Sequence, residues 1–233
     1  MYKTLTFCRK FGKISYIIDK RFLLLALFTL TKNAQMGGTK VESMELLKKA
    51  IIERGKVLPG NVLKVGSFLN NQMDIRLISE MGKDIKRYFE NCGVTKILTV
   101  EASGIGIACL TAQFFDCNVV FAKKSKTANV DGAFYTAESY SFTHKVSNTL
   151  IVPKEYISKE DKILIVDDFL ANGKAVEACM DIIGQAGAQV AGVAIIIEKG
   201  FQGAGDRLRK QGVNLYSLAI IDKMENGEII FRN

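Results

Sequence analysis

The sequence predicts an α/β protein built on a mostly parallel, twisted sheet with helices on both faces. Its 233 residues, 48% of them hydrophobic, are enough for one such domain with a sizeable core and a short additional segment. Short apolar runs rich in β-branched residues recur along the chain. Segments with helical spacing of apolar residues alternate with these runs, which is the pattern of strands joined by crossover helices.

The first elements are two helices separated by a short segment. Apolar residues at helical spacing predict a helix that starts at Met44 and is ended by Gly55. The segment 61–71 is short and is expected to be extended. Asp74 opens the second helix, whose apolar residues recur at helical spacing, and Gly93 is expected to end it.

The later elements alternate in type. Strands are expected where β-branched apolar runs occur, at 96–100, 118–122, 149–153, 162–166, 189–199 and 214–221. Helices are expected at 104–115, 173–184 and 203–211. The polar stretch 123–145 contains Gly132 and several aromatic residues, and it predicts a flexible hairpin.

The first 43 residues carry a basic charge that the rest of the chain lacks. They hold eight Lys or Arg and two acids, so the other 190 residues account for only +2 of the formal charge of +8. An apolar run at 22–30 is shorter than the ~20 residues that span a bilayer. Three interpretations are open: a signal peptide, a peripheral membrane helix, or a start assigned upstream of the true one at Met44. The poor cleavage site at 31–36 favours the third, and with it a cytoplasmic protein without a membrane role for the body.

The cysteines and the histidine argue against a disulfide framework or a zinc site. Five cysteines are scattered without CxxC spacing, mostly in apolar surroundings, which favours reduced, buried thiols. The single histidine, His144, excludes a site with two histidines and is expected to be an exposed loop residue.

The stretch from Ile163 to Ala175, ILIVDDFLANGKA, combines a buried strand, two acids and a loop of small residues. Small residues let main-chain N–H groups approach an anion, and the helix that follows adds the positive end of its dipole. Asp167 and Asp168 leave the strand toward opposite sides, so one can bind sugar hydroxyls while the other faces the reacting centre. A diol flanked by a phosphate describes a ribose 5-phosphate, bound beyond the carboxyl ends of the strands.

This pattern resembles the motif of the phosphoribosyltransferases that use phosphoribosyl pyrophosphate (PRPP). The segments VLKVGSFLNNQMD, EASGIG, VVFAKKSK, TAESYSFT, DDFLANGKA and VAIIIEKGFQ are similar, in chain order, to segments of the bacterial xanthine-specific branch of that family. The likeness covers 44–233 and implies a type I phosphoribosyltransferase fold with a small hood region, preceded by an extension, 1–43, that is a mis-called start or disordered. It also implies transfer of the phosphoribosyl group to xanthine in purine salvage, with magnesium bound mainly by PRPP rather than by protein, and a homodimer.

The resemblance assigns roles to individual residues. Asp167 and Asp168 are the catalytic acids on the ribose side. The loop residues expected to hold the 5-phosphate of PRPP are Ala171, Asn172, Gly173, Lys174 and Ala175. The residues expected to contact xanthine are Leu63, Asn70 and Lys199. The residues expected around pyrophosphate are Glu101, Ala102, Ser103, Gly104, Lys123 and Lys124. Lys174 departs from the uncharged residue expected there, so its side chain has no assigned role.

Several alternatives stay open at this point. The segment 123–145 is either a loop that closes over the reactants or an ordinary exposed hairpin. Phe201 either stacks on the base or belongs to the core. The acid pair could be turn residues at a strand end, or belong to a receiver-type phosphoacceptor, although receivers carry such a pair near the chain start. A guanine or hypoxanthine phosphoribosyltransferase is one alternative function, and a PRPP-sensing regulator that binds nucleic acid is another, which the nearly neutral body speaks against.

Overall fold

The computed structural model describes residues 40–124, 132–141, 146–225 and 227–232. The apolar run 22–30, His144 and the first cysteine therefore lie outside the described residues, as do parts of the predicted hairpin loop. The division of the chain at residues 43 and 44 stays a prediction. The first described helix, α2 (Lys40–Arg54), begins upstream of Met44.

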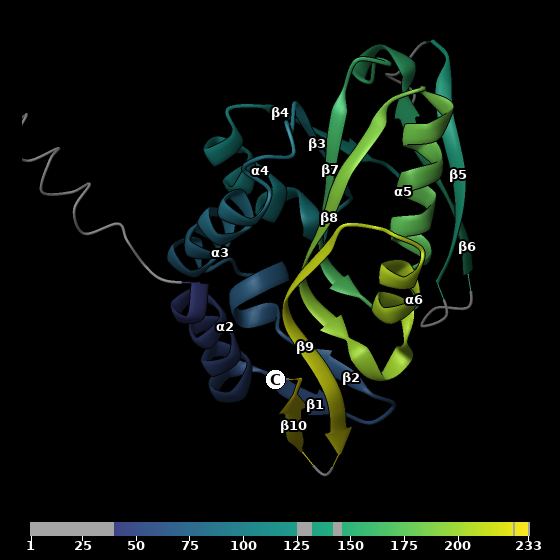
Figure 1. Cartoon of the computed structure of the whole chain (residues 1–233). Coiled ribbons are helices and arrows are strands. Elements are labelled where there is room, and N and C mark those ends of the chain that lie inside the picture. The colour runs from purple at the N-terminus through teal and green to yellow at the C-terminus, as the bar shows by residue number, and fades with distance from the viewer. Residues whose placement is uncertain (1–39, 125–131, 142–145, 226, 233) are drawn as a thin grey trace, which may run out of the picture. The chain divides into compact units, whose positions relative to one another are not determined.

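The centre of the structure is a sheet of six strands in the order β10-β9-β8-β7-β3-β4 (Figure 1). The five strands from β9 to β4 are parallel to their neighbours, and β10 is antiparallel to β9. Their bounds are β3 Lys96–Val100, β4 Asn118–Ala122, β7 Lys162–Leu170, β8 Gln189–Lys199, β9 Leu215–Glu225 and β10 Glu228–Phe231. The predicted α/β class with a mostly parallel sheet is confirmed, because crossover helices join strands that run in one direction.

Helices cover both faces of this sheet (Figure 1). One apolar core joins it to α2, α3 (Ile75–Tyr88) and α4 (Ser103–Phe115). A second core joins the other face to α5 (Lys174–Gln185), α6 (Ala204–Lys210) and the hairpin of β5 (Phe134–Ser141) and β6 (Val146–Pro153). Strands buried on both sides explain why the sequence shows continuous apolar runs instead of alternation.

Two short additions lie outside the main sheet. The strands β1 (Lys56–Leu58) and β2 (Val62–Lys64) form an antiparallel pair, and a π-helical turn over Gly66–Asn70 follows. The prediction of an extended segment over 61–71 is therefore only partly right. The predicted strand at 149–153 belongs to β6 and pairs with β5, not with the main sheet. The spacing of apolar residues within a strand does not predict which other strand it pairs with.

The strand that carries the two acids is longer than predicted. Its ladder with β8 continues through Phe169 and Leu170, so Asp167 and Asp168 lie inside β7 and not after its end. The prediction ended the strand at Val166 because the continuous apolar run ends there. The partner strand β8 runs on to Lys199, and its backbone groups keep β7 extended past the acids.

Some predicted boundaries and burial states were also wrong. The helix α3 starts after Asp74, whose Oδ1 accepts a hydrogen bond from Leu77 N at 3.2 Å, as expected for an N-cap. It ends at Tyr88, before the predicted end at Gly93, and a turn closed by a bond from Cys92 N to Phe89 O leads to Gly93.

The prediction of buried cysteines is only partly right. The four described cysteines are all free, but only Cys179 is buried, and Cys109 is exposed. No helix of the described part of the chain is long and apolar enough to cross a membrane.

Candidate active site

The two acids of β7 form the middle of the site. Asp167 is 8% exposed and Asp168 is 7% exposed. Asp167 Oδ1 accepts a hydrogen bond from Asp168 N at 2.9 Å, and Asp168 Oδ1 accepts one from Phe169 N at 3.0 Å. Each carboxylate therefore has one oxygen tied to the backbone of β7, which fixes its direction.

The carboxylate of Asp167 faces the loop that begins α4. A Cβ placed on Gly104 would lie 3.2 Å from Asp167 Oδ1 and much closer to the hydroxyl of Thr99, so only glycine fits there. Glu101 N donates to Ala122 O at 3.1 Å, which ties the start of the loop to the end of β4. The peptide bond between Glu101 and Ala102 is cis.

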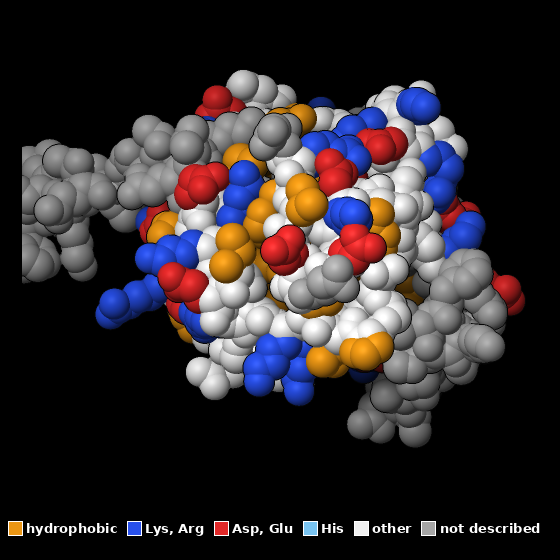
Figure 2. Space-filling view, turned by 90° about the horizontal axis from the view of Figure 1, so that it is seen from below, with side chains coloured by type: hydrophobic (Ala, Val, Ile, Leu, Met, Phe, Trp, Pro, Cys, Tyr) orange, Lys and Arg blue, Asp and Glu red, His pale blue; other side chains and the backbone are white. Residues whose placement is uncertain are grey.

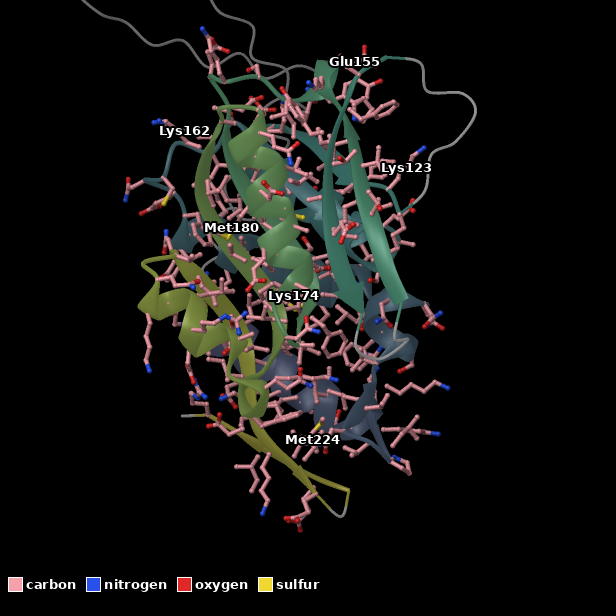
Figure 3. All side chains as sticks on the ribbon, turned by 90° about the vertical axis from the view of Figure 1, so that its right-hand side faces the viewer. Lys123, Glu155, Lys162, Lys174, Met180 and Met224 are labelled. Atoms are coloured by element: carbon pink, nitrogen blue, oxygen red, sulfur yellow. The ribbon has the colours of Figure 1, made fainter. Side chains whose placement is uncertain are left out.

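The predicted pyrophosphate residues come together around this loop. Lys124 N donates to Glu101 Oε1 at 2.6 Å, and the charge of Lys124 acts on Asp167. The backbone of Lys123 bridges to Ile151 of β6, so its side chain lies beside the β5–β6 hairpin (Figure 3). Gly104 and the charge of Lys124 thus face Asp167, and Glu101 is bonded to the backbone of Lys124. The hydroxyl of Thr99 is buried without a hydrogen-bond partner in this part of the structure.

The carboxylate of Asp168 points toward a different segment. Asn70, the last residue of the π-helical turn, donates from Nδ2 to Asp168 Oδ2 at 3.0 Å. The predicted base-contacting segment is therefore bonded directly to the acid pair across 98 residues of sequence. The expectation that the two acids serve different sides agrees with these partners.

Of the other two predicted base contacts, Lys199 lies beside the aromatic ring that follows the acids. Lys199 Nζ donates to Asn61 O at 3.1 Å and lies 5.8 Å from the centroid of the Phe169 ring. Leu63, in β2, is 6% exposed and packs into the first core. Burial lowers the pKa of Lys199 below its ordinary value.

The aromatic residue beside Lys199 is not the one that the sequence suggested. Phe201 is 37% exposed in the short 3-10 turn after β8 and does not belong to either core. Phe169 lies beside the ammonium group of Lys199 instead. The sequence could have pointed to Phe169 through its position directly after the acid pair. It was missed because the strand was predicted to end at Val166.

The loop 171–175 has the conformation expected of an anion-binding turn. Lys174 N donates to Asn172 Oδ1 at 3.0 Å, and Gly173 has a φ of +87° just before α5 begins. That left-handed conformation favours glycine. Ala171 and Ala175 are half-buried beside them. The loop leads into α5, whose N-terminal dipole end favours an anion.

The side chain of Lys174 is held by an ion pair within α5. Its Nζ lies 2.8 Å from Glu177 Oε2, and Figure 3 shows it at the end of α5 where the helix begins. Glu177 also accepts a bond from Arg207 of α6 at 2.5 Å. Arg207 was not predicted, because its partners are 30 and 35 residues away in the sequence.

An Asp167→Asn variant is expected to be more stable than the parent protein at neutral pH. Burial, followed by the charge of Asp168, raises the pKa of Asp167 well above its usual range. The folded protein then holds this proton more tightly than the unfolded chain, so stability falls as pH rises from about 4 through the raised pKa. Asparagine removes this loss, and we expect a Tm higher by roughly 2–4 °C, the effect of about 1 kcal/mol in a domain of this size.

Thermal unfolding of both proteins between pH 4 and pH 9 measures this difference. The Tm values should approach each other as the pH falls toward 4, because the unfolded chain then also begins to bind this proton. A variant less stable than the parent at pH 8 would contradict the assignment of a buried carboxyl with a raised pKa.

The described residues contain no cluster of three or more His, Cys, Asp or Glu side chains able to hold a metal ion. The donors present are the two neighbouring carboxylates of β7. Such a pair suits Mg²⁺, which keeps several waters and binds through one or two carboxylates together with substrate phosphates.

Comparison with known proteins finds relatives that match most of this chain. The family model for the phosphoribosyl transferase domain matches residues 65–214. A xanthine phosphoribosyltransferase of Clostridium novyi is 54% identical over 190 residues, which are 82% of this chain and 100% of the relative. One from Bifidobacterium animalis subsp. lactis is 51% identical over 193 residues, 82% of this chain and 100% of the relative.

Solved structures agree on the fold. An adenine phosphoribosyltransferase from Thermoanaerobacter pseudethanolicus has a TM-score of 0.62 at 19% identity and covers 76% of this chain and 98% of that chain. The Trypanosoma brucei enzyme in complex with AMP, pyrophosphate and ribose-5-phosphate has a TM-score of 0.63 at 18% identity, with 75% and 78% covered. The acid pair, the anion-binding loop and these matches lead to one conclusion: the chain belongs to the phosphoribosyltransferase family.

Proposed function

We propose that this protein transfers the 5-phosphoribosyl group of PRPP to xanthine, forming xanthosine 5′-phosphate and pyrophosphate in purine salvage. The observation that carries the proposal is the hydrogen bond between Asn70 and Asp168, because it joins the base-contacting segment to the ribose acids. The names of the relatives, each more than half identical to this chain, support xanthine as the base.

The reaction displaces pyrophosphate from C1 of the ribose through a state with positive charge on the sugar. The protein then has to align two reactants and stabilise separating charge, and no covalent nucleophile is needed. In this proposal the carboxylates of Asp167 and Asp168 lie on the ribose side, where their charge favours the developing cation. The main-chain N–H groups of 171–175 hold the 5-phosphate, and Glu101 to Gly104 with Lys123 and Lys124 receive the pyrophosphate.

Magnesium is the proposed cofactor, bound mainly through PRPP. It would neutralise the charge of the leaving pyrophosphate. Asp168 is the carboxylate proposed to approach such an ion or its waters, because its Oδ2 is directed toward Asn70 and the base-contacting segment. Asp167 has less room for an ion, because its Oδ1 packs against Gly104.

The base is proposed to lie between Phe169 and the side chains of Leu63, Asn70 and Lys199. The ammonium group of Lys199 donates to an exocyclic oxygen of a 6-oxopurine, and in the structure it already bonds to a carbonyl, that of Asn61. The Phe169 ring offers an apolar face to the purine. Closure of the segment 123–145 is proposed to exclude water, which would otherwise attack C1.

A test of the proposal is a spectrophotometric assay with PRPP and each of xanthine, guanine, hypoxanthine and adenine. Xanthine should have the highest kcat/KM. A preference for guanine or hypoxanthine would keep the reaction and correct the base, since contacts at the purine 2-position decide that choice. Turnover of adenine alone would overturn the assignment.

A regulator that senses PRPP and binds nucleic acid is the alternative from another class. On the face seen in Figure 2, the coloured acidic and basic side chains are interspersed and do not form one continuous basic surface. This supports the enzyme over the regulator. Retention on heparin at moderate salt together with no turnover of any purine would favour the regulator. A cytoplasmic location and a homodimer remain predictions.

A further inference from the structure

The short helix α6 is hydrogen-bonded to the anion-binding loop through one arginine. Arg207 Nη2 donates to the carbonyl oxygen of Asn172 at 3.1 Å and to Glu177 Oε1 at 2.5 Å. A Cβ added to Gly173 would lie 3.1 Å from the same nitrogen. The guanidinium group therefore lies directly against the backbone of the loop, on the side of the Asn172 carbonyl.

This contact sets the direction of one peptide group. In a trans peptide the C=O and the following N–H point in opposite directions, so a bond that holds the Asn172 carbonyl toward Arg207 turns the N–H of Gly173 away from it. A phosphate is bound by N–H groups and repelled by carbonyl oxygens. Arg207 thus keeps an acceptor out of the loop and aims a donor into it.

The charge of Arg207 is balanced on its own side of the loop. Glu177 pairs with Arg207 through Oε1 and with Lys174 through Oε2, at 2.5 and 2.8 Å. Both cations lower the pKa of Glu177 against the opposing effect of its burial, so this carboxylate stays charged. Arg207 and Lys174 are therefore committed to Glu177, which leaves the phosphate to the main-chain donors.

The helix that carries Arg207 is itself firmly anchored. Arg209 makes two bonds to Glu198, at 3.1 and 2.7 Å, and Glu198 is 1% exposed directly before Lys199. Ser217 donates to the same carboxylate at 2.5 Å. Two-point arginine–carboxylate pairs fix geometry as well as charge. Arg207 consequently acts on the loop from a helix held against β8 and β9.

We propose that Arg207 is a positioning residue for the 5-phosphate of PRPP, which it serves by fixing the Asn172–Gly173 peptide from behind. The proposal rests on the proposed PRPP-dependent reaction but not on the identity of the base. It predicts that loss of Arg207 weakens binding of the phosphate end of PRPP and largely spares the chemical step and the binding of xanthine.

The test is an Arg207→Met variant, since methionine keeps the helix propensity and the apolar stem. Loss of a charged hydrogen bond of this kind corresponds to roughly a tenfold rise in the KM for PRPP. The same rise is expected in the Kd of ribose 5-phosphate measured by calorimetry. The kcat and the KM for xanthine should change less than about threefold. Arg207→Lys, which retains a donor, should recover part of the loss.

Two control variants separate positioning from simpler effects. Lys210→Met removes an exposed cation from the same helix and should leave both KM values unchanged. Glu177→Gln keeps an acceptor for Arg207 and should weaken ribose 5-phosphate binding less than Arg207→Met does. If Glu177→Gln reproduces the full loss, the charge of Glu177 governs the loop rather than the bond from Arg207 to Asn172 O, and the proposal is wrong. If the loss caused by Arg207→Met disappears at high salt, the long-range charge of Arg207 explains it and the proposal is wrong.

Failure of this proposal can be told apart from failure of the proposed function. If the parent protein binds ribose 5-phosphate and Arg207→Met binds it equally well, the positioning role is wrong and the reaction is unaffected. If the parent protein neither binds ribose 5-phosphate nor uses PRPP, the proposed function itself fails. Matching Tm values of parent and variants show that each measurement is made on folded protein.

Discussion

An Asp168→Asn variant is expected to turn over xanthine about 100-fold more slowly than the parent protein, with a much smaller change in the KM for PRPP. The carboxylate of Asp168 is 7% exposed and is fixed by bonds from Phe169 N and Asn70 Nδ2. Asparagine has the same shape and removes the charge. The charge matters most when the sugar becomes positive, so its loss lowers kcat more than it weakens ground-state binding.

Steady-state kinetics with both substrates varied measures this effect, and the exposed acid Asp181 of α5 offers a matched control. Asp181→Asn should keep the parent kcat. Asp168→Asn should also keep the parent Tm within a few degrees, because the fold loses no packing. A kcat within about threefold of the parent would mean that Asp168 only orders Asn70.

A Lys199→Ala variant is expected to raise the KM for xanthine roughly 10- to 100-fold and to leave the KM for PRPP nearly unchanged. Burial already lowers the pKa of Lys199, so its ammonium group gains from every acceptor that replaces lost water. In the structure that acceptor is Asn61 O, and a purine oxygen is proposed to take or share this place. Alanine leaves that oxygen without a donor, whichever 6-oxopurine is bound.

The control for this variant is Lys162→Ala, because Lys162 begins β7 at the opposite end of the strand from the acids (Figure 3). It should behave like the parent protein. Equal losses for xanthine and PRPP in Lys199→Ala would contradict the assignment to the base. They would instead indicate that the lysine supports the segment after β1, to which it is bonded.

The sequence was most informative where the chemistry is contiguous. Asp167, Asp168 and the loop 171–175 lie within one short stretch, and a glycine among small residues directly before a helix is typical of an anion-binding turn. The strand and helix alternation was equally local, and it was sufficient for the α/β class and a parallel sheet. The sequence pattern of one segment placed the acids after the end of the strand. The actual length of β7 depends on its ladder with β8, a segment about 25 residues further along the chain.

Contacts between distant segments could not be predicted in this way. Asn70 meets Asp168 across 98 residues, and Arg207 meets Asn172 across 35. Neither pair has a spacing that any helical or strand period would mark. Phe169 was passed over for Phe201 for the same reason, since its contact with Lys199 joins two different strands.

By itself the sequence determined the alternation of strands and helices, the apolar faces and the residues that can bind a phosphate and a diol, because these depend on neighbours within a few positions. The tertiary structure alone decided which side of the acids faces the base segment, and it brought Arg207 behind the phosphate loop. The physical reason is that strand order and helix packing bring residues together regardless of their separation in the chain, and a buried polar group is stabilised only by the partner it then meets.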